Sequence, residues 1–98
     1  MAKEVIWLKR ASDKLKNIFD YLLSNWNSET TENFIEKVNQ KVSLLQYFPN
    51  IGLRSQKKPD LRRIILSQQN ILIYRQKGNK IIIVNIFDTR QNPDKMKF

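Results

Sequence analysis

The spacing of the hydrophobic positions changes along the chain and divides it into a strand, two helices and three further strands. Residues 3–8 come first, with Val5 and Trp7 on one side of an extended chain and Ile6 and Leu8 on the other. A strand with two apolar sides is typical of one that is covered on both faces or is central in a sheet. We therefore predict a short first strand here.

A first amphipathic helix is predicted near Ser12–Asn25. Its apolar residues run from Leu15 to Trp26 at the spacing that keeps one stripe on a helix. The hydroxyl of Ser12 can cap the first turn. Trp26, at the end of the stripe, is expected to pack under the turn that follows.

A second amphipathic helix is predicted near Glu29–Tyr47. Ser28 is its expected cap, and Pro49 and Gly52 end it. Because the connection between the two helices is short, we expect them to form an antiparallel hairpin. Residues 49–60 then form the one substantial loop.

Three apolar runs fill residues 61–66, 71–75 and 80–88, and short polar segments separate them. Adjacent strands joined by tight connections form an antiparallel meander. The order β-α-α-β-β-β predicts an α+β fold, in which a helical hairpin packs on one face of a twisted, mostly antiparallel sheet. The expected core consists of Leu15, Phe19, Leu22, Val38, Val42, Leu45, Ile64, Ile73, Ile83 and Val84.

Composition narrows the classes of function. The chain has 98 residues and no internal repeat or linker, so we expect a single domain over residues 1–98. It contains neither cysteine nor histidine. Their absence removes thiolate chemistry, the commonest metal ligand and the usual acid–base group of neutral pH, so we expect no metal and no cofactor. There is no membrane-length apolar run and no signal-peptide core, which favours a cytoplasmic protein.

The charge is concentrated in the second half. Residues 1–49 hold seven Lys/Arg and six Asp/Glu, a net charge of +1, whereas residues 50–98 hold eleven and three, a net charge of +8. A basic half beside a balanced one indicates a surface for an acidic partner, either a nucleic acid or an acidic protein.

Several segments, taken together in this order, resemble the RelE/ParE superfamily of bacterial toxins from type II toxin–antitoxin modules. They are residues 20–26 (DYLLSNW), residues 44–52 (LLQYFPNIG) and the meander, in which residues 61–64 (LRRI) lead to residues 71–75 (ILIYR) and then to residues 86–93 (IFDTRQNP). The Pro-x-x-Gly before the meander, the Tyr-Arg that ends the middle strand and the Arg beyond the last strand are typical of the ParE-like branch. The resemblance covers nearly the whole chain.

The resemblance implies a toxin of a plasmid-stabilisation module that a cognate antitoxin neutralises in a toxin–antitoxin hetero-oligomer. ParE-like members are reported to poison DNA gyrase, whereas RelE-like members enter the ribosome and cut mRNA. The arginine that RelE-like nucleases place at the start of the middle strand falls on Ile71, and their tail tyrosine falls near Met96. Only Arg90 matches the arginine after the last strand. We therefore favour the ParE-like function, with a ribosome-dependent mRNA endonuclease as the alternative.

The candidate contact residues for the target or the antitoxin are cationic: Arg54, Lys57, Lys58, Arg62, Arg63, Arg75 and Arg90. Arg90 is also the leading catalytic candidate if the protein is a nuclease. Arg62 and Arg63 are consecutive in a strand, so their side chains point to opposite faces and at most one of them serves a given surface. Each cation also has a structural interpretation, for example Arg75 in an ion pair with Asp88 or Asp60.

Two further interpretations remain. Tyr74 lies on the face opposite Arg75, where a strand tyrosine is more often a core residue than a catalytic one. The chain could also be a non-catalytic basic nucleic-acid-binding module, whose affinity for naked DNA or RNA would fall steeply with salt. No helix-turn-helix, aromatic RNA-binding motif or zinc pattern supports that alternative.

Overall fold

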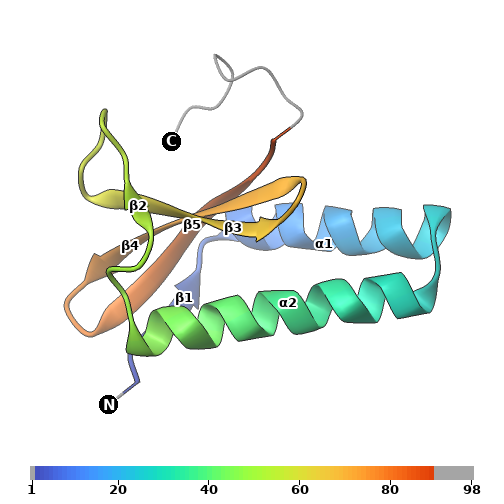
Figure 1. Ribbon diagram of the computed structural model, residues 1–98, viewed down its shortest axis with the longest axis horizontal. Helices are drawn as coiled ribbons and strands as arrows, with labels where there is room; N and C mark the ends of the chain where they lie inside the picture. Colours follow the sequence, from blue (N-terminus) through green and yellow to red (C-terminus); the bar gives the residue numbers. More distant parts are fainter. Residues whose placement is uncertain (1, 90–98) are drawn as a thin grey trace.

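The apolar stripes of two antiparallel helices pack against one face of a five-stranded sheet (Figure 1). The computed structural model describes residues 2–89. Its elements are β1 (Glu4–Trp7), α1 (Lys9–Asn25), α2 (Ser28–Tyr47), β2 (Leu53–Arg54), β3 (Leu61–Ser67), β4 (Asn70–Lys77) and β5 (Lys80–Asp88). The strand order is β1-β5-β4-β3-β2, and only the β1–β5 pair is parallel. The predicted α+β fold is confirmed.

Both helix starts differ from the prediction. α1 begins at Lys9, directly after β1, and no side chain caps it, so the expected Ser12 cap is wrong. The backbone N–H of Leu8 still bonds to β5, at Ile83, so the chain leaves the sheet immediately before the helix. α2 is capped by Asn27 rather than Ser28, because the Asn27 side chain accepts a hydrogen bond from the Thr30 N–H at 2.8 Å.

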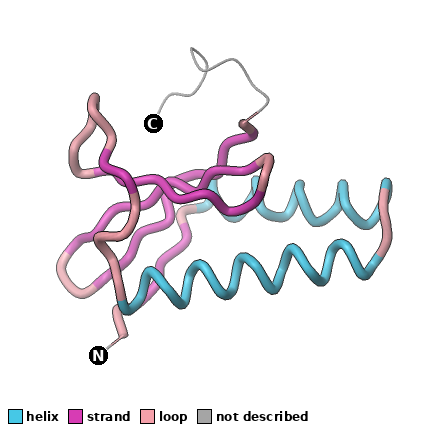
Figure 2. The backbone as a smooth tube through the Cα atoms, viewed as in Figure 1, coloured by secondary structure: helices cyan, strands magenta, loops and turns pink. Residues whose placement is uncertain are grey.

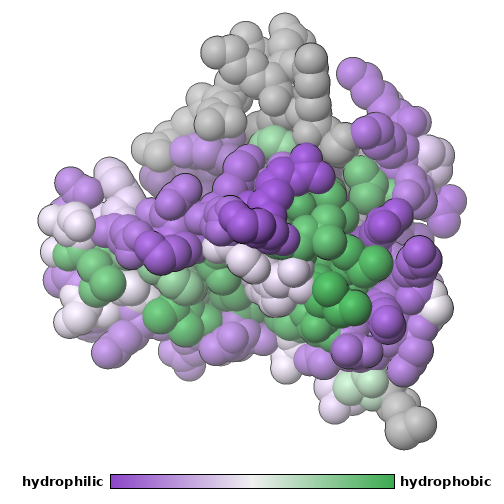
Figure 3. All heavy atoms as spheres, turned by 180° about the vertical axis from the view of Figure 1, so that it is seen from behind, coloured by the Kyte–Doolittle hydropathy of each residue, from purple (hydrophilic) through white to green (hydrophobic). Residues whose placement is uncertain are grey.

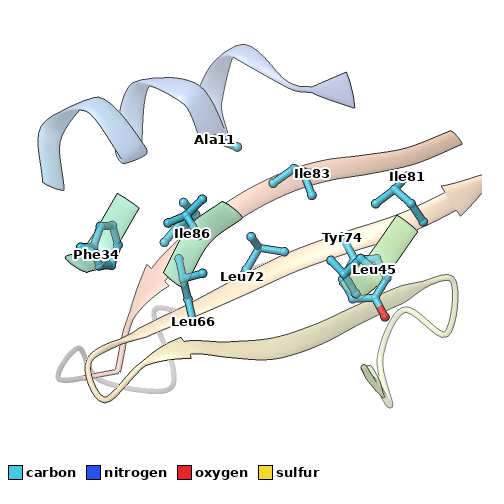
Figure 4. Packing of buried hydrophobic residues seen from close by; sticks show 10 residues of the cluster. Ala11, Phe34, Leu45, Leu66, Leu72, Tyr74, Ile81, Ile83 and Ile86 are labelled. Carbon is cyan, nitrogen blue, oxygen red and sulfur yellow. The ribbon is translucent and has the colours of Figure 1, made fainter. Parts of the chain in front are cut away.

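The main core lies between the helices and the sheet (Figure 4). Leu45 of α2 and Ile83 of β5 are fully buried there, and Val38 is nearly so. The remaining predicted residues of this layer are only half-buried but pack against the cluster: Leu15, Phe19, Leu22, Val42 and Ile64. Phe19 and Phe34 meet edge to face, with 5.9 Å between ring centroids, and join the two helices.

Two predicted core residues, Ile73 and Val84, lie on the other face of the sheet. With Leu61, Ile82 and Phe87 they form a second buried cluster. We call this side, turned away from the helices, the outer sheet face. Ile83 and Val84 are neighbours in one strand, so their side chains must point to opposite faces. Grouping them in one layer was therefore wrong.

A β-bulge in β5 adjusts the pattern further. Ile73 pairs with Asn85 whereas Tyr74 pairs with Ile83, which leaves Val84 as an extra residue. Val84 and Asn85 consequently both belong to the outer face, and Ile86 returns to the helix side. The buried Asn85 side chain accepts a hydrogen bond from the Ile86 N–H at 2.9 Å, which pairs a polar group at the irregularity.

The two edges of the sheet are short strands. The predicted 49–60 loop contains β2, a two-residue strand on the β3 edge that sequence periodicity did not reveal. β1 forms the other edge, and its residues Val5–Trp7 are only half-buried. Seen from behind, apolar side chains gather at the sheet end of the molecule (Figure 3). Figure 2 shows that loops connect the two layers only at their ends.

Trp26 does not pack under the turn between the helices as expected, because 65% of its surface is exposed. It follows the last residue of α1, and its backbone N–H bonds to Leu22. None of the helices in the described residues is both long enough and apolar enough to cross a membrane.

Candidate functional site

The candidate cations do not share one surface. By strand register, Arg54 and Arg62 lie opposite each other on the helix side of the sheet, in the row of Tyr74. Arg63 and Arg75 lie on the outer sheet face. The expectation that Arg62 and Arg63 point to opposite faces is therefore confirmed. Lys57 and Lys58 are exposed in the turn between β2 and β3, and Arg90 lies outside the described residues.

Arg63 and Arg75 form a cationic pair on two neighbouring strands of the outer sheet face. They are diagonal neighbours on β3 and β4, a geometry that places such side chains about 7 Å apart. The cross-strand partners of Arg63 are Leu53 and Ile73, and those of Arg75 are Leu61 and Ile82. These rows contain no carboxylate, and within residues 2–89 neither arginine makes an ion pair, including the one considered for Arg75 with Asp88 or Asp60.

Apolar neighbours strengthen the electrostatic effect of this pair. Leu61, Ile73 and Ile82 are all at least 92% buried, so the guanidinium groups stand on a surface of low polarity. An anion that binds there is screened less than one at a fully hydrated surface. Guanidinium groups can hold an acidic group by charge-assisted hydrogen bonds, and they stay protonated at neutral pH, so they do not accept a proton.

Strand alternation and register add two cations that sequence analysis missed, Lys77 and Lys80. Lys77 is two residues beyond Arg75 in β4, and its partner in the register is Lys80 of β5. Both therefore follow Arg75 on the outer sheet face. Because side chains alternate between the two faces of a strand, continuing the predicted strand two residues beyond Arg75 would have identified Lys77.

Tyr74 anchors the segment of residues 49–60, which carries Arg54, Lys57 and Lys58 and which we call the anchored loop. The side chain is fully buried, and its hydroxyl donates a hydrogen bond to the Pro49 C=O at 2.7 Å and accepts one from the Gly52 N–H at 2.9 Å. Figure 4 shows the hydroxyl at the margin of the core, pointing toward this loop. The expected structural role of Tyr74 is confirmed.

Gly52 is required by the same contact. A Cβ atom at this position would lie 2.6 Å from the Tyr74 hydroxyl and 2.9 Å from the Arg63 carbonyl oxygen. No side chain fits into that space. The Pro-x-x-Gly pattern before the meander and the Tyr-Arg pattern within it are thus two halves of one contact.

Arg62 and Gln76 complete the anchor from the neighbouring strands. The Arg62 guanidinium donates to the carbonyl oxygens of Asn50 at 3.1 Å and Gly52 at 2.8 Å. The Gln76 amide donates to the Asn50 side-chain oxygen at 2.5 Å. Arg62 is thereby engaged in holding the loop, whereas Arg63, next to it in the chain, is not.

The environment of Tyr74 also determines its protonation. Burial raises the pKa of the phenol, and the Gly52 N–H and the positive charge of Arg62 oppose this effect only in part. Tyr74 is therefore a protonated hydrogen-bonding group at neutral pH and is unsuited to accept a proton. Among residues 2–89, no group of three acidic side chains comes together in a way that could hold a metal ion.

The position that corresponds to the RelE-like arginine is apolar in space as well as in sequence. Ile71 is half-buried in β4 and packs against the outer-face cluster. The position that corresponds to the tail tyrosine, near Met96, lies outside the described residues.

Comparisons with known proteins agree with this architecture. A family model described as the ParE toxin of the type II toxin–antitoxin system, parDE, matches residues 5–93. A sequence comparison with the curated proteins gives no match.

Solved structures share the fold. The chain is similar to one from the chromosomal ParDE TA system of P. aeruginosa, with a TM-score of 0.73 and 24% identity over 89% of this chain and 96% of that one. It is also similar to the isolated E. coli RelE toxin, with a TM-score of 0.64 and 14% identity over 95% and 90% of the two chains. A third is the YoeB/ParE toxin from Agrobacterium tumefaciens, with a TM-score of 0.62 and 12% identity over 87% and 96%.

The family model spans nearly the whole sequence, including the anchored loop and the meander that carries Arg63 and Arg75. The fold of the described residues agrees with it. The chain therefore belongs to the ParE toxin family of type II toxin–antitoxin systems.

Proposed function

We propose that this toxin inhibits bacterial growth by acting on DNA gyrase and that a cognate antitoxin neutralises it. The observation that carries the proposal is the family match over residues 5–93. The similarity to a chain of a ParDE system supports the antitoxin as partner. Action on gyrase does not need a nucleophile in the toxin, because a bound protein can trap its target in one state.

The outer sheet face supports an acidic partner. Arg54, on the helix side of the sheet, and Lys57 and Lys58, in the turn between β2 and β3, are separate candidate contacts. On the outer sheet face, Arg63 and Arg75 carry two positive charges without carboxylates in their rows. Such a surface attracts acidic proteins and increases their association rate, an effect that salt weakens. We propose the same role for Arg90, on sequence grounds alone.

The apolar character of Ile71 favours gyrase over the ribosome as target. Cleavage of mRNA needs cationic groups around the scissile phosphate and a group that accepts the proton of the ribose 2′-hydroxyl. Ile71 cannot supply the first, and Tyr74, with its raised pKa, is a poor candidate for the second. Cleavage of mRNA is the alternative activity, and the following experiment must distinguish it from action on gyrase.

A short pulse of toxin expression separates the two activities. A gyrase-directed toxin should induce the DNA-damage response and filamentation while transcripts remain intact. Mapping of transcript 5′ ends and a DNA-damage reporter are measured in the same culture. Cuts in phase with codons, without DNA damage, would contradict the proposal and establish the nuclease.

Substitutions on the outer sheet face test its role. We expect Arg63→Ala/Arg75→Ala to weaken toxicity, because each lost charge-assisted contact costs roughly 1.5–3 kcal/mol of binding. Lys9→Ala/Lys16→Ala is the matched control, since it removes the same charge from exposed positions on α1. Equal toxicity of both double variants at equal expression would exclude this face from target binding.

The antitoxin is tested with the product of the adjacent gene. Co-expression and pull-down at low and high salt should recover a complex whose association slows as salt increases. If both proteins fold and no complex forms under any condition, that gene product is not the antitoxin.

A further inference from the structure

β3 has a free edge beyond the end of β2. β2 pairs only with Arg62 and Arg63, whereas β3 continues to Ser67. The backbone groups of Leu61 bond on the β2 side, donating to the Lys58 C=O and accepting from the Ser55 N–H, each at 2.9 Å. Because alternate residues of a strand direct their backbone groups to the same edge, Ile65 directs its N–H and C=O outward, past the end of β2. Among the described residues, β3 pairs only with β2 and β4.

The side chain of Ile65 makes this edge apolar. It is 68% exposed, more than any other large hydrophobic side chain in residues 2–89. A hollow of about 620 Å³ lies beside it, between β3 and α2, which runs beneath the strand in Figure 1. An exposed apolar edge strand is a template for a further strand, and natural proteins usually protect such edges.

The opposite wall of the hollow is cationic. Lys37 and Lys41 stand one helical turn apart on α2, and both line it. None of the residues that line the hollow is acidic, and within residues 2–89 neither lysine makes an ion pair. The hollow thus combines open backbone groups and an apolar side chain on one wall with two positive charges on the other.

We propose that an extended segment of the antitoxin adds as a strand to the β3 edge at Ile65, with apolar and acidic residues in alternation. Successive side chains of an added strand point to opposite faces. One set then lies on the outer sheet face beside Ile65, and the other set points toward Lys37 and Lys41. This pattern combines main-chain hydrogen bonds with charge complementarity. The inference rests on the antitoxin assignment proposed above.

Amide exchange measured by NMR tests the edge directly. The antitoxin probe is the product of the adjacent gene, added to the full-length toxin. In the free toxin we expect the Ile65 amide to exchange readily, because it faces solvent. In the complex it should exchange at least roughly tenfold more slowly, because it donates to the added strand.

Two variants test the contacts separately. Ile65→Pro removes the outward N–H, and an edge position tolerates proline, so we expect binding to weaken roughly tenfold or more. Lys37→Ala/Lys41→Ala removes the cationic wall and should weaken binding about tenfold at low salt and less at high salt. Lys9→Ala/Lys16→Ala carries the same charge change on α1 and should bind as the wild type does. If Ile65→Pro fails to fold, the lysine variants and the exchange measurement still decide.

The possible failures are distinguishable. No complex with the wild type would overturn the antitoxin assignment and the edge proposal with it. A complex in which Ile65 exchange is unchanged, or in which the Lys37/Lys41 variant binds as well as its control, would overturn the edge proposal alone. Protection of Ile65 in concentrated toxin without antitoxin would assign the edge to a second copy of the chain and would also overturn it.

Discussion

At the residue scale, Tyr74 connects segments that are far apart in the sequence. Its hydroxyl bridges the Pro49 C=O and the Gly52 N–H, and its ring belongs to the same core cluster as Leu45. The side chain therefore contributes apolar burial and also pairs two backbone groups that would otherwise lack partners. It fixes the start of the loop that carries Arg54, Lys57 and Lys58.

Tyr74→Phe should destabilise the protein by about 1–3 kcal/mol, because the Pro49 C=O and the Gly52 N–H lose their partner. The Gly52 amide should also exchange faster with solvent. Denaturant unfolding and amide exchange measure the two effects. Tyr47→Phe is the matched control, since Tyr47 is 64% exposed and the same change there should have little effect on stability. Equal stability of the two variants would contradict the anchoring role.

The raised pKa of Tyr74 predicts a loss of stability in alkali. Above the ordinary phenol pKa of 10.0, the unfolded chain loses this proton while the folded chain keeps it. The folded state then binds more protons, so the free energy of unfolding falls as pH rises from there to the raised folded pKa, and it is unaffected below. Unfolding titrations across this range should show a steeper fall for the wild type than for Tyr74→Phe. Parallel curves would mean that burial does not shift the pKa.

At the element scale, contacts outside each segment determine where helices and strands begin and which way their side chains face. The sequence suggested Ser12 and Ser28 as caps, yet both lie within the helices: α1 has no side-chain cap and α2 uses Asn27. In β5 the bulge at Val84 moves each later residue to the face opposite the one that regular alternation would give it. A continuous apolar run cannot reveal such a bulge, because both faces of the strand are buried.

Asn27→Ala should destabilise the protein by about 1 kcal/mol, because the Thr30 N–H loses its cap. Ser28→Ala is the matched control and should change stability by less than about 0.5 kcal/mol. Thermal and denaturant unfolding of both variants show which of the two residues caps α2. A larger loss for Ser28→Ala would restore the cap expected from the sequence.

At the scale of the whole molecule, the main core and the Arg63–Arg75 pair lie on opposite sides of the sheet. The helices and the helix side of the sheet form the main core, whereas the outer sheet face carries Arg63 and Arg75. Arg63 and Arg75 are therefore held on strands that a packed layer supports from behind. A surface supported in this way is in position before any partner arrives, so the proposed binding on this face would cost less entropy.

Leu45→Ala tests the main core, because Leu45 is fully buried between α2 and the sheet. We expect a loss of about 2–5 kcal/mol, from lost burial and from the cavity that remains. Leu23→Ala, the same change at a side chain that is 55% exposed, should cost far less. Similar losses in denaturant unfolding would contradict the two-layer packing.

The order of the long elements, the α+β class and the family resemblance could all be predicted from the sequence; the structure confirms the first two, and the family match confirms the third. These depend on local periodicity and on short motifs, which a chain carries without reference to its partners in space. The sequence also determined that Arg62 and Arg63 diverge, since neighbouring residues of a strand always do.

The tertiary structure alone decided what these divergent residues do. Arg62 holds the loop through the Asn50 and Gly52 carbonyl oxygens, and Arg63 joins Arg75 on the outer sheet face. It also decided that Gly52 must lack a side chain, because Tyr74 occupies that space from 22 positions along the chain. Such contacts depend on strand register and on bulges, which follow from packing over the whole sheet rather than from any one segment.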